Sequence, residues 1–219
     1  MATPADMLSA AFARHRQGDF KQAERDYRAV LKKQPHNPDA LYLLGMLCLD
    51  RDRPREAAKY LDRAVEALGR TARPVDPAWR LTLGTALQRD GKPAAALTAF
   101  EAALKSSPAN PDALFCRATA LQDLGRLEEA AGGYEAVLKV APKHADAANN
   151  LGAAKRDSGE SSAAIAAFQR AVASRPNFTE ALYNLGHSLA DAGRAVEAVS
   201  VLRAAADARP DDIDLHMAL

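Results

Sequence analysis

The chain has 219 residues, enough for one large or two small domains, and its 29 basic and 28 acidic side chains leave a formal net charge of +1. This balance provides no net field that would draw the protein to nucleic acid or to an anionic membrane, so neither is expected as a partner. Alanine is the commonest residue, whereas isoleucine occurs only at Ile165 and Ile213, a composition that favours helix over strand.

The sequence carries no signal for export or membrane insertion. No stretch approaches the run of about 18 apolar residues that a membrane-spanning helix needs. The first residues, MATPADMLSAAFARH, have no apolar core behind a basic leader, so no signal peptide is expected. Two cysteines, Cys48 and Cys116, do not make a disulfide framework. The sequence therefore predicts a cytoplasmic protein.

The chain repeats itself with a period of 34 residues. Prolines that end successive units share this spacing, as do small residues inside the preceding helices; the two series are Pro108, Pro142, Pro176 and Pro210, and Gly84, Ala118, Gly152 and Gly186. Short sequences with a central glycine recur between them, such as DLGRL at 123–127 and DAGRA at 191–195, and glycine there suits the left-handed end of a helix. The period predicts stacked units of two helices joined by a tight turn.

In chain order, the first unit is expected at 4–37. The second begins within PHNPDALY at 35–42, where Asn37 can cap the helix and a proline takes its first position. Five additional residues, 72–76, precede the third unit, so a longer loop or an extended second helix is expected there. The fourth begins within PANPDALF at 108–115, as the second does. The expected units are 4–37, 38–71, 77–110, 111–144, 145–178 and 179–212, and residues 213–219 begin a seventh.

Each unit carries two small residues twelve positions apart. The pairs are Ala11/Ala23, Gly45/Ala57, Gly84/Ala96, Ala118/Ala130, Gly152/Ala164 and Gly186/Ala198. On antiparallel helices the two members are expected to face each other, so that the backbones approach closely and larger residues pack around the contact. A glycine within a helix costs about 0.5–1 kcal/mol relative to alanine, and burial of one leucine, worth about 1.5–3 kcal/mol, outweighs this cost.

With these residues in view, the chain resembles the tetratricopeptide repeat family. The sixth unit follows the family pattern at Leu182, Leu185, Gly186, Leu189, Gly193, Ala198, Leu202, Ala205 and Pro210. The resemblance implies an all-α fold in one domain, residues 1–219, in which the units form a right-handed superhelical solenoid and the first helices line a concave groove. Arg14 and Lys155 depart from the pattern at apolar positions, and Trp79 falls one residue before the expected tryptophan.

The same resemblance implies a scaffold that holds an extended peptide or a helix of a partner protein in the groove. First-helix residues that point away from the apolar stripe would line it, and they mix aromatic, amide and charged groups. For any single residue, a solvated helix face is the alternative. The candidate partner-binding residues are Tyr42, Gln88, Arg89, Phe115, Gln122, Asp123, Asn149, Asn150, Arg156, Tyr183, Asn184, His187 and Asp191.

Two groove chemistries of the family can be compared with this chain. Co-chaperone repeats hold a C-terminal carboxylate with lysine, arginine and asparagine side chains. The corresponding positions here are Leu8, Phe12, Leu43, Ala78 and Thr82, none of which can donate a charge-assisted hydrogen bond to a carboxylate. Asn150 and Asn184, at equal positions of consecutive units, resemble the asparagine ladder of O-linked N-acetylglucosamine transferases, whose amides hold a peptide backbone. The alternative function is therefore the substrate-recognition arm of a larger transferase.

Catalytic and metal-binding motifs are absent from the sequence. It contains no HExxH, CxxC or GxGxxG, and its five histidines are scattered. The stretch GTALQRDGKP at 84–93 resembles a phosphate-binding loop only superficially, because Pro93 stands where a magnesium-binding hydroxyl would be. We therefore expect no catalytic residue, metal or cofactor, and no enzymatic activity. Self-association through an uncapped C-terminal end is a further partner hypothesis, since a solenoid without a polar cap exposes an apolar face.

Overall fold

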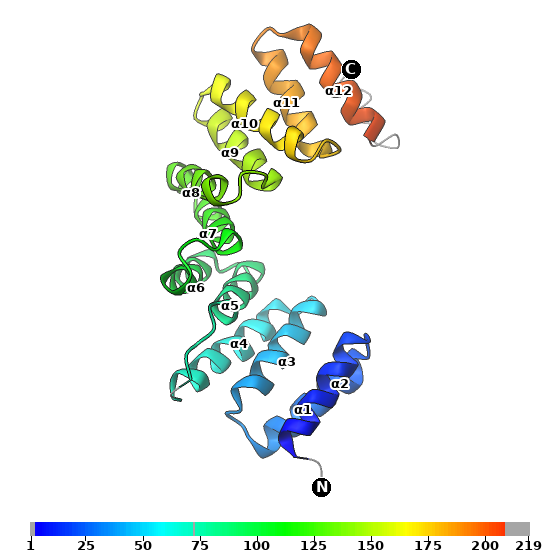
Figure 1. Cartoon of the computed structure of the whole chain (residues 1–219), viewed down its shortest axis with the longest axis vertical. Helices are drawn as coiled ribbons and strands as arrows, with labels where there is room; N and C mark the ends of the chain where they lie inside the picture. Colours follow the sequence, from blue (N-terminus) through cyan, green and yellow to red (C-terminus); the bar gives the residue numbers. More distant parts are fainter. Residues whose placement is uncertain (1–2, 72, 209–219) are drawn as a thin grey trace. The chain divides into compact units, whose positions relative to one another are not determined.

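Helices make up the folded chain (Figure 1). The computed structural model describes residues 3–71 and 73–208, and within these ranges it has twelve α-helices and no strand. The all-α fold of two-helix repeats that the sequence predicts is confirmed. The expected seventh unit at 213–219, and the self-association hypothesis that depends on this end, lie outside the described residues.

The chain divides into two compact units, residues 1–108 and 109–219. Unit 1 contains α1 (Pro4–Arg16), α2 (Phe20–Lys33), α3 (Pro38–Asp50), α4 (Pro54–Gly69), α5 (Pro77–Arg89) and α6 (Pro93–Ser106). Unit 2 contains α7 (Pro111–Asp123), α8 (Leu127–Val140), α9 (Ala145–Asp157), α10 (Ser161–Ser174), α11 (Thr179–Asp191) and α12 (Ala195–Ala208). In both units, odd-numbered helices are the first helices of a repeat and even-numbered helices are the second.

Side-chain caps begin the first helices where the sequence predicts them. The side chain of Asn37 accepts a hydrogen bond from the amide of Ala40 at 2.9 Å, and Asn110 does the same for Ala113 at 2.9 Å. Each cap satisfies an amide that has no partner within its own helix, and a proline at the first helical position needs none. Local sequence therefore sets where these helices start.

The turns within the repeats depend on a residue with positive φ. Glycine takes this role at 18, 91, 125, 159 and 193, with φ between 73° and 84°. In the second repeat Asp52 replaces it at a φ of 52°. Aspartate tolerates this left-handed conformation better than most side chains, and its carboxylate accepts a 2.9 Å hydrogen bond from Arg89.

The glycines inside the first helices give room to one large side chain each. A Cβ atom at Gly84 would lie 2.4 Å from a ring carbon of Phe100, and one at Gly152 would lie 2.6 Å from the ring of Phe168. The atoms nearest these glycines thus belong to a residue four positions after the alanine that the sequence pairs with them. The large residue that was expected around each contact thus packs directly on the glycine: it is aromatic at Gly84 and Gly152, whereas Leu61 and Leu202 take this place at Gly45 and Gly186.

The fourth repeat reverses the arrangement. Its first helix carries Ala118, and the small partner is Gly133 on the second helix, where a Cβ atom would lie 2.8 Å from the Ala118 Cβ and 3.3 Å from its Cα. The neighbouring Gly132 meets nothing within 4 Å. Packing therefore requires a glycine at position 133 but not at position 132.

The junction between the second and third repeats is longer, as the sequence predicts. Helix α4 has 16 residues, whereas α2 and α6 have 14 each. Near the end of α4, Ala67 and Leu68 are buried in one small core with Trp79 at the start of α5. Trp79, which departs from the family pattern by one position, is only 8% exposed and closes this small core.

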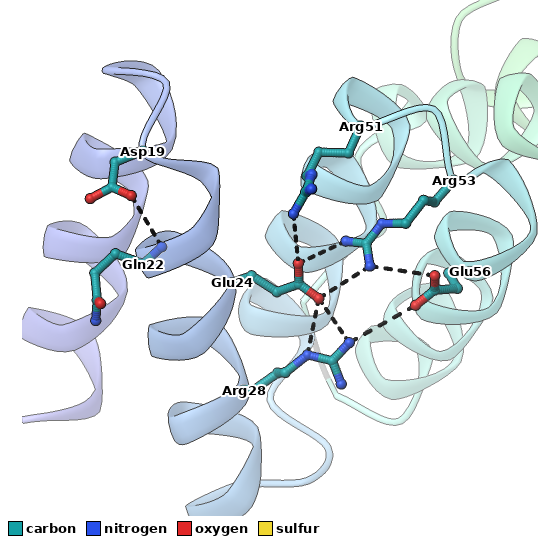
Figure 2. Close-up of polar contacts among 7 residues, drawn as sticks. All are labelled: Asp19, Gln22, Glu24, Arg28, Arg51, Arg53 and Glu56. Atoms are coloured by element: carbon teal, nitrogen blue, oxygen red, sulfur yellow. Dashed lines mark hydrogen bonds and ion pairs between the residues drawn. The ribbon is translucent and has the colours of Figure 1, made fainter.

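A cluster of charged residues joins the first repeat to the second (Figure 2). The carboxylate of Glu24 on α2 accepts hydrogen bonds of 2.9 Å each from Arg28 on the same helix and from Arg53 at the start of α4. Arg51 lies 3.6 Å from it, and Arg53 also contacts Glu56 at 3.4 Å. With its side chain only 15% exposed, Glu24 is shielded enough from water for these ion pairs to stabilise the contact.

The two departures from apolar positions are both explained by ion pairs. Arg14 on α1 donates to Asp26 on α2, which joins the two helices of the first repeat. The ammonium group of Lys155 on α9 lies 3.1 Å from Glu160 and 4.0 Å from Glu135 on α8. Each long side chain therefore reaches a carboxylate on a neighbouring element instead of being buried as a charge.

Glu24 provides a test of the repeat junction. Burial alone would raise the pKa of Glu24, but the hydrogen bonds from Arg53 and Arg28 outweigh it and hold the pKa below its ordinary value of 4.5. Glu24→Gln is expected to lower the free energy of unfolding at pH 7 by about 1 kcal/mol, because the arginines lose their counter-charge. Urea denaturation followed by circular dichroism measures this difference.

The difference in unfolding free energy between wild type and Glu24→Gln should depend on pH. Since the pKa of Glu24 is lower in the folded than in the unfolded state, its stabilising effect is complete above about pH 4.5 and is lost as the pH falls through the folded value. The difference between wild type and Glu24→Gln should therefore disappear in acid. A difference that persists undiminished at about pH 3 would contradict this role of the carboxylate.

Candidate functional site

Ten of the predicted partner-binding residues belong to the first helices of unit 2, and we call this set the first-helix face. Its members come from α7, α9 and α11, and they are Phe115, Gln122, Asp123, Asn149, Asn150, Arg156, Tyr183, Asn184, His187 and Asp191. All were expected to lie together from their helical positions. Hydrogen bonds and ring contacts join most of them.

One chain of hydrogen bonds connects α9 to α11. The amide nitrogen of Asn149 donates to Glu180 at 2.9 Å, and its oxygen accepts from the amide nitrogen of Asn184 at 3.1 Å. The oxygen of Asn184 accepts from Arg156 at 3.2 Å, and the Arg156 guanidinium lies 5.8 Å from the ring of Phe168. Asn149 is only 2% exposed, so it supports the surface from below.

A second chain connects α7 to α9 through a side chain of α8. The hydroxyl of Tyr134 donates to Gln122 at 2.6 Å and accepts from the amide nitrogen of Asn150 at 3.3 Å. Burial raises the pKa of Tyr134, so the hydroxyl keeps its proton and remains a donor at neutral pH. Phe115 lies against the Tyr134 ring with centroids 5.9 Å apart and stacks on His144 at 4.8 Å.

Two aromatic side chains of the first-helix face lie against each other on α11. Tyr183 is 38% exposed and lies against the ring of His187, with ring centroids 4.3 Å apart. The Nε2 atom of His187 is buried and has no hydrogen-bond partner among the described residues. Together the two rings offer an apolar surface with an unsatisfied polar atom beside it.

In unit 1 the predicted partner-binding residues hold neighbouring repeats together. Tyr42 stacks on Trp79 with ring centroids 4.3 Å apart, and its hydroxyl lies 3.1 Å from that of Thr82. Arg89 donates to Asp52 on the preceding turn, and Gln88 is half-buried on α5. These three residues belong to unit 1 and make contacts within it.

Sequence reasoning missed Tyr134 as part of the surface. It belongs to a second helix, and it occupies the aromatic position that Phe100 and Phe168 take in neighbouring repeats, 34 residues away on either side. Only Tyr134 of these three has a hydroxyl, which reaches the first-helix face. Aligning the repeats could have identified Tyr134, because it is the one tyrosine among these three equivalent positions.

Both cysteine thiols are deactivated by burial. Burial raises the pKa of Cys116 on α7 to about 11, and that of Cys48 on α3 likewise to about 11, so both thiols stay protonated at neutral pH and are poor nucleophiles. Across residues 3–71 and 73–208, no three histidine, cysteine or carboxylate side chains come together to hold a metal ion. Over the same residues, every helix is too short or too polar to cross a membrane.

Three solved structures share this architecture with the chain, among others. YrrB, described as a TPR protein with an unusual peptide-binding site, superposes with a TM-score of 0.73 at 22% identity, over 82% of this chain and 90% of that one. MamA residues 41 to the end from Desulfovibrio magneticus RS-1 superposes with a TM-score of 0.70 at 25% identity, over 80% of this chain and 97% of that one. PilF from Pseudomonas aeruginosa superposes with a TM-score of 0.76 at 13% identity, over 98% of this chain and 95% of that one.

Sequence comparison agrees with the architecture. No curated protein sequence is significantly similar to the chain. The family model for the tetratricopeptide repeat matches residues 10–77, 81–132, 117–155 and 150–213, which together span nearly all of the described helices. With its two-helix units, its 34-residue period and this match, the chain belongs to the tetratricopeptide repeat family.

Proposed function

We propose that the protein is a non-catalytic scaffold whose first-helix face binds an extended peptide segment of a partner protein. The observation that carries this proposal is the exposed Tyr183 ring packed on the half-buried His187, which lies on α11 next to Asn184 and its hydrogen-bonded amides. Proteins of this repeat family generally mediate protein–protein contacts, and YrrB, which shares the fold, is described as having a peptide-binding site.

The chemistry of the surface suits a peptide. An extended peptide presents backbone donors and acceptors that need partners when they are buried. The Asn150 oxygen accepts no hydrogen bond within the described residues, and the Nε2 atom of His187 has no partner there either. The Tyr183 ring supplies contact area at a small entropy cost, because it has only two side-chain torsions.

The surface is also held rigid before any ligand arrives. Asn149 and Asn184 are fixed by Glu180 and Arg156, so these groups have already lost their rotamer freedom. A bound peptide would therefore order fewer side chains of the protein. We assign Tyr183, His187 and Asn150 as contact residues and Asn149 as a residue that positions Asn184.

Replacing Tyr183 tests this assignment. Peptides selected on the wild-type protein from a random phage-displayed library are expected to bind Tyr183→Ala at least about tenfold more weakly, since an aromatic anchor often contributes 2 kcal/mol or more. Fluorescence anisotropy of the labelled peptides measures the affinity. Gln169→Ala, an exposed change on the second helix α10, serves as the matched control and should bind as the wild type does.

Equal affinity of wild type, Tyr183→Ala and His187→Ala for every selected peptide would refute the proposal. The melting temperature of each variant must match that of the wild type for the comparison to hold. Because Tyr183 is exposed at the surface, its truncation should cost little stability.

The transferase-arm hypothesis remains a prediction of the sequence. It rests on Asn150 and Asn184 as equivalent positions of a ladder, but the two side chains have different partners. Asn150 donates to Tyr134, whereas both ends of the Asn184 amide are occupied by Asn149 and Arg156. The asparagine pair therefore gives no specific support for that function over a general peptide scaffold.

A further inference from the structure

Unit 1 contains a pocket that the proposed function does not use. It has a volume of about 530 Å³ and is lined by residues of α4, α5 and α6. The lining residues of α4 are Arg55, Ala58, Lys59, Asp62 and Val65; those of α5 are Arg80, Leu83 and Leu87; those of α6 and the turn before it are Lys92, Ala95, Thr98, Ala99 and Ala102.

The buried part of the pocket lining, which we call its floor, is apolar. It consists of Leu83, Ala58 and Ala99, and the half-buried Val65 and Leu87 line the pocket with them. On α6 the lining residues recur three and four positions apart, and each is alanine or threonine, so a second backbone can approach that wall closely. The lining stretch of α4, from Arg55 to Val65, rises about 15 Å, the length of a ten-residue helix.

The rim of the pocket is basic. Arg55, Lys59 and Arg80 line it, and none of the three has a hydrogen bond or ion pair within the described part of the chain. Lys92 lies 2.7 Å from Asp90 and is thereby neutralised, and Asp62 is the one lining carboxylate. Three uncommitted cations against one anion make a local positive site in a chain whose overall net charge is only +1.

We propose that this pocket binds an acidic amphipathic helix of a partner protein. Charge complementarity argues for acidic residues, because glutamates or aspartates flanking an apolar stripe would meet Arg55, Lys59 and Arg80. The apolar floor argues for a helix over an extended strand, since a helix satisfies its own backbone hydrogen bonds whereas a strand would leave them unpaired against leucine and alanine. Apolar side chains three and four positions apart on the incoming helix fit the alanine and threonine wall of α6.

This surface and the first-helix face share no residue, and they belong to different units. The two proposals can therefore fail separately. A ligand of the pocket should bind normally to Tyr183→Ala, and a ligand of the first-helix face should bind normally to variants of the pocket.

The test uses a designed peptide as the probe. It is a fluorescein-labelled helix of about 14 residues, with leucine at every third or fourth position and glutamate on both flanks of that stripe. Fluorescence anisotropy with the full chain is expected to show saturable binding that weakens as salt is added, because the contact depends on charge. A matched peptide with lysine in place of every glutamate should bind at least about tenfold more weakly.

Variants of the rim and floor locate the binding. Lys59→Glu combined with Arg80→Glu should weaken the acidic peptide at least about tenfold, and Thr98→Trp, which fills the pocket from its exposed edge, should do the same. The control combines Arg25→Glu and Lys33→Glu, two exposed cations of α2 with no ion pair in the described residues, and it has the same net charge as the rim variant. The control should bind within about twofold of the wild type.

Several results would overturn the proposal. It would be refuted if the acidic peptide did not bind, or if this peptide bound the rim variant and the control equally. It would also be refuted if the lysine peptide bound as well as the acidic one. Displacement of the peptide by dodecanoate, with Leu-to-Ala peptides binding undiminished, would instead indicate a site for small anionic amphiphiles. A rim variant that changes sedimentation of the free protein without affecting peptide affinity would indicate contact between copies of this chain.

Discussion

Phe168→Ala is expected to lower the free energy of unfolding of the protein by about 3–5 kcal/mol, the usual cost of removing a buried phenylalanine. The ring is fully buried and lies in a cluster with Leu185 and Leu189 of the following repeat. Its loss leaves a cavity beside Gly152, and the glycine has no side chain that could fill it. Urea denaturation followed by circular dichroism measures the change.

Two further variants make the result specific. Phe168→Leu keeps most of the apolar volume, so it should cost clearly less than Phe168→Ala. Val196→Ala removes apolar atoms from a residue that is 88% exposed, and its effect should stay within about 0.5 kcal/mol. Equal stability of Phe168→Ala and wild type would show that the ring does not join the repeats.

Gly84→Leu is expected to destabilise the protein by about 1–3 kcal/mol through overpacking. A Cβ atom at this position already overlaps the ring of Phe100, with three ring carbons within 2.9 Å. Since Phe100 is fully buried, the ring cannot turn out into water to make room. A fall in the melting temperature of the variant, recorded by circular dichroism, is the expected observation.

A double-mutant cycle isolates the contact between Gly84 and Phe100. Phe100→Ala alone leaves a cavity, and the leucine at position 84 can occupy part of it. The double variant should therefore be more stable than the sum of the two single changes predicts, with a coupling of about 0.5–3 kcal/mol. Strict additivity would show that the two positions are not in contact.

Adjacent glycines on α8 provide the matched control. Gly132→Ala should stabilise the protein by about 0.5–1 kcal/mol, because alanine favours helix and the position is open. Gly133→Ala should destabilise it, since the new Cβ meets both the side chain and the backbone of Ala118. Equal effects of the two changes would refute a packing role for the helical glycines.

The fold was largely predictable from the sequence because its determinants are local. Asn37 and Asn110 satisfy amides three residues away, and the turn glycines adopt a conformation that depends on a single residue. The partner of each helical glycine was less predictable. The spacing placed Ala96 opposite Gly84, whereas the atoms nearest Gly84 belong to the Phe100 ring. A helical side chain leans toward the N-terminus of its helix, so the ring of Phe100 reaches back over the turn that holds Ala96.

The candidate site was predictable only as a set of positions on one side of the helices. Helical periodicity placed Asn149, Asn184 and Tyr183 on a common face, but it said nothing of their partners. Tyr42 was at an equivalent position, and its ring is used to stack on Trp79 across a junction lengthened by residues 72–76. Tyr134 was not predicted because it lies on a second helix. It contributes only through its hydroxyl, whose position depends on how the helices pack.

The amino-acid sequence by itself determined the helices, their caps and turns, and the repeat family, since each follows from interactions within about four residues or from the 34-residue period. Tertiary structure decided which polar side chains are left for a partner. Arg89 meets Asp52 and Asn184 meets Asn149 across 37 and 35 positions of the chain. Such contacts exist only once neighbouring repeats have packed, so no local pattern can show which groups they consume.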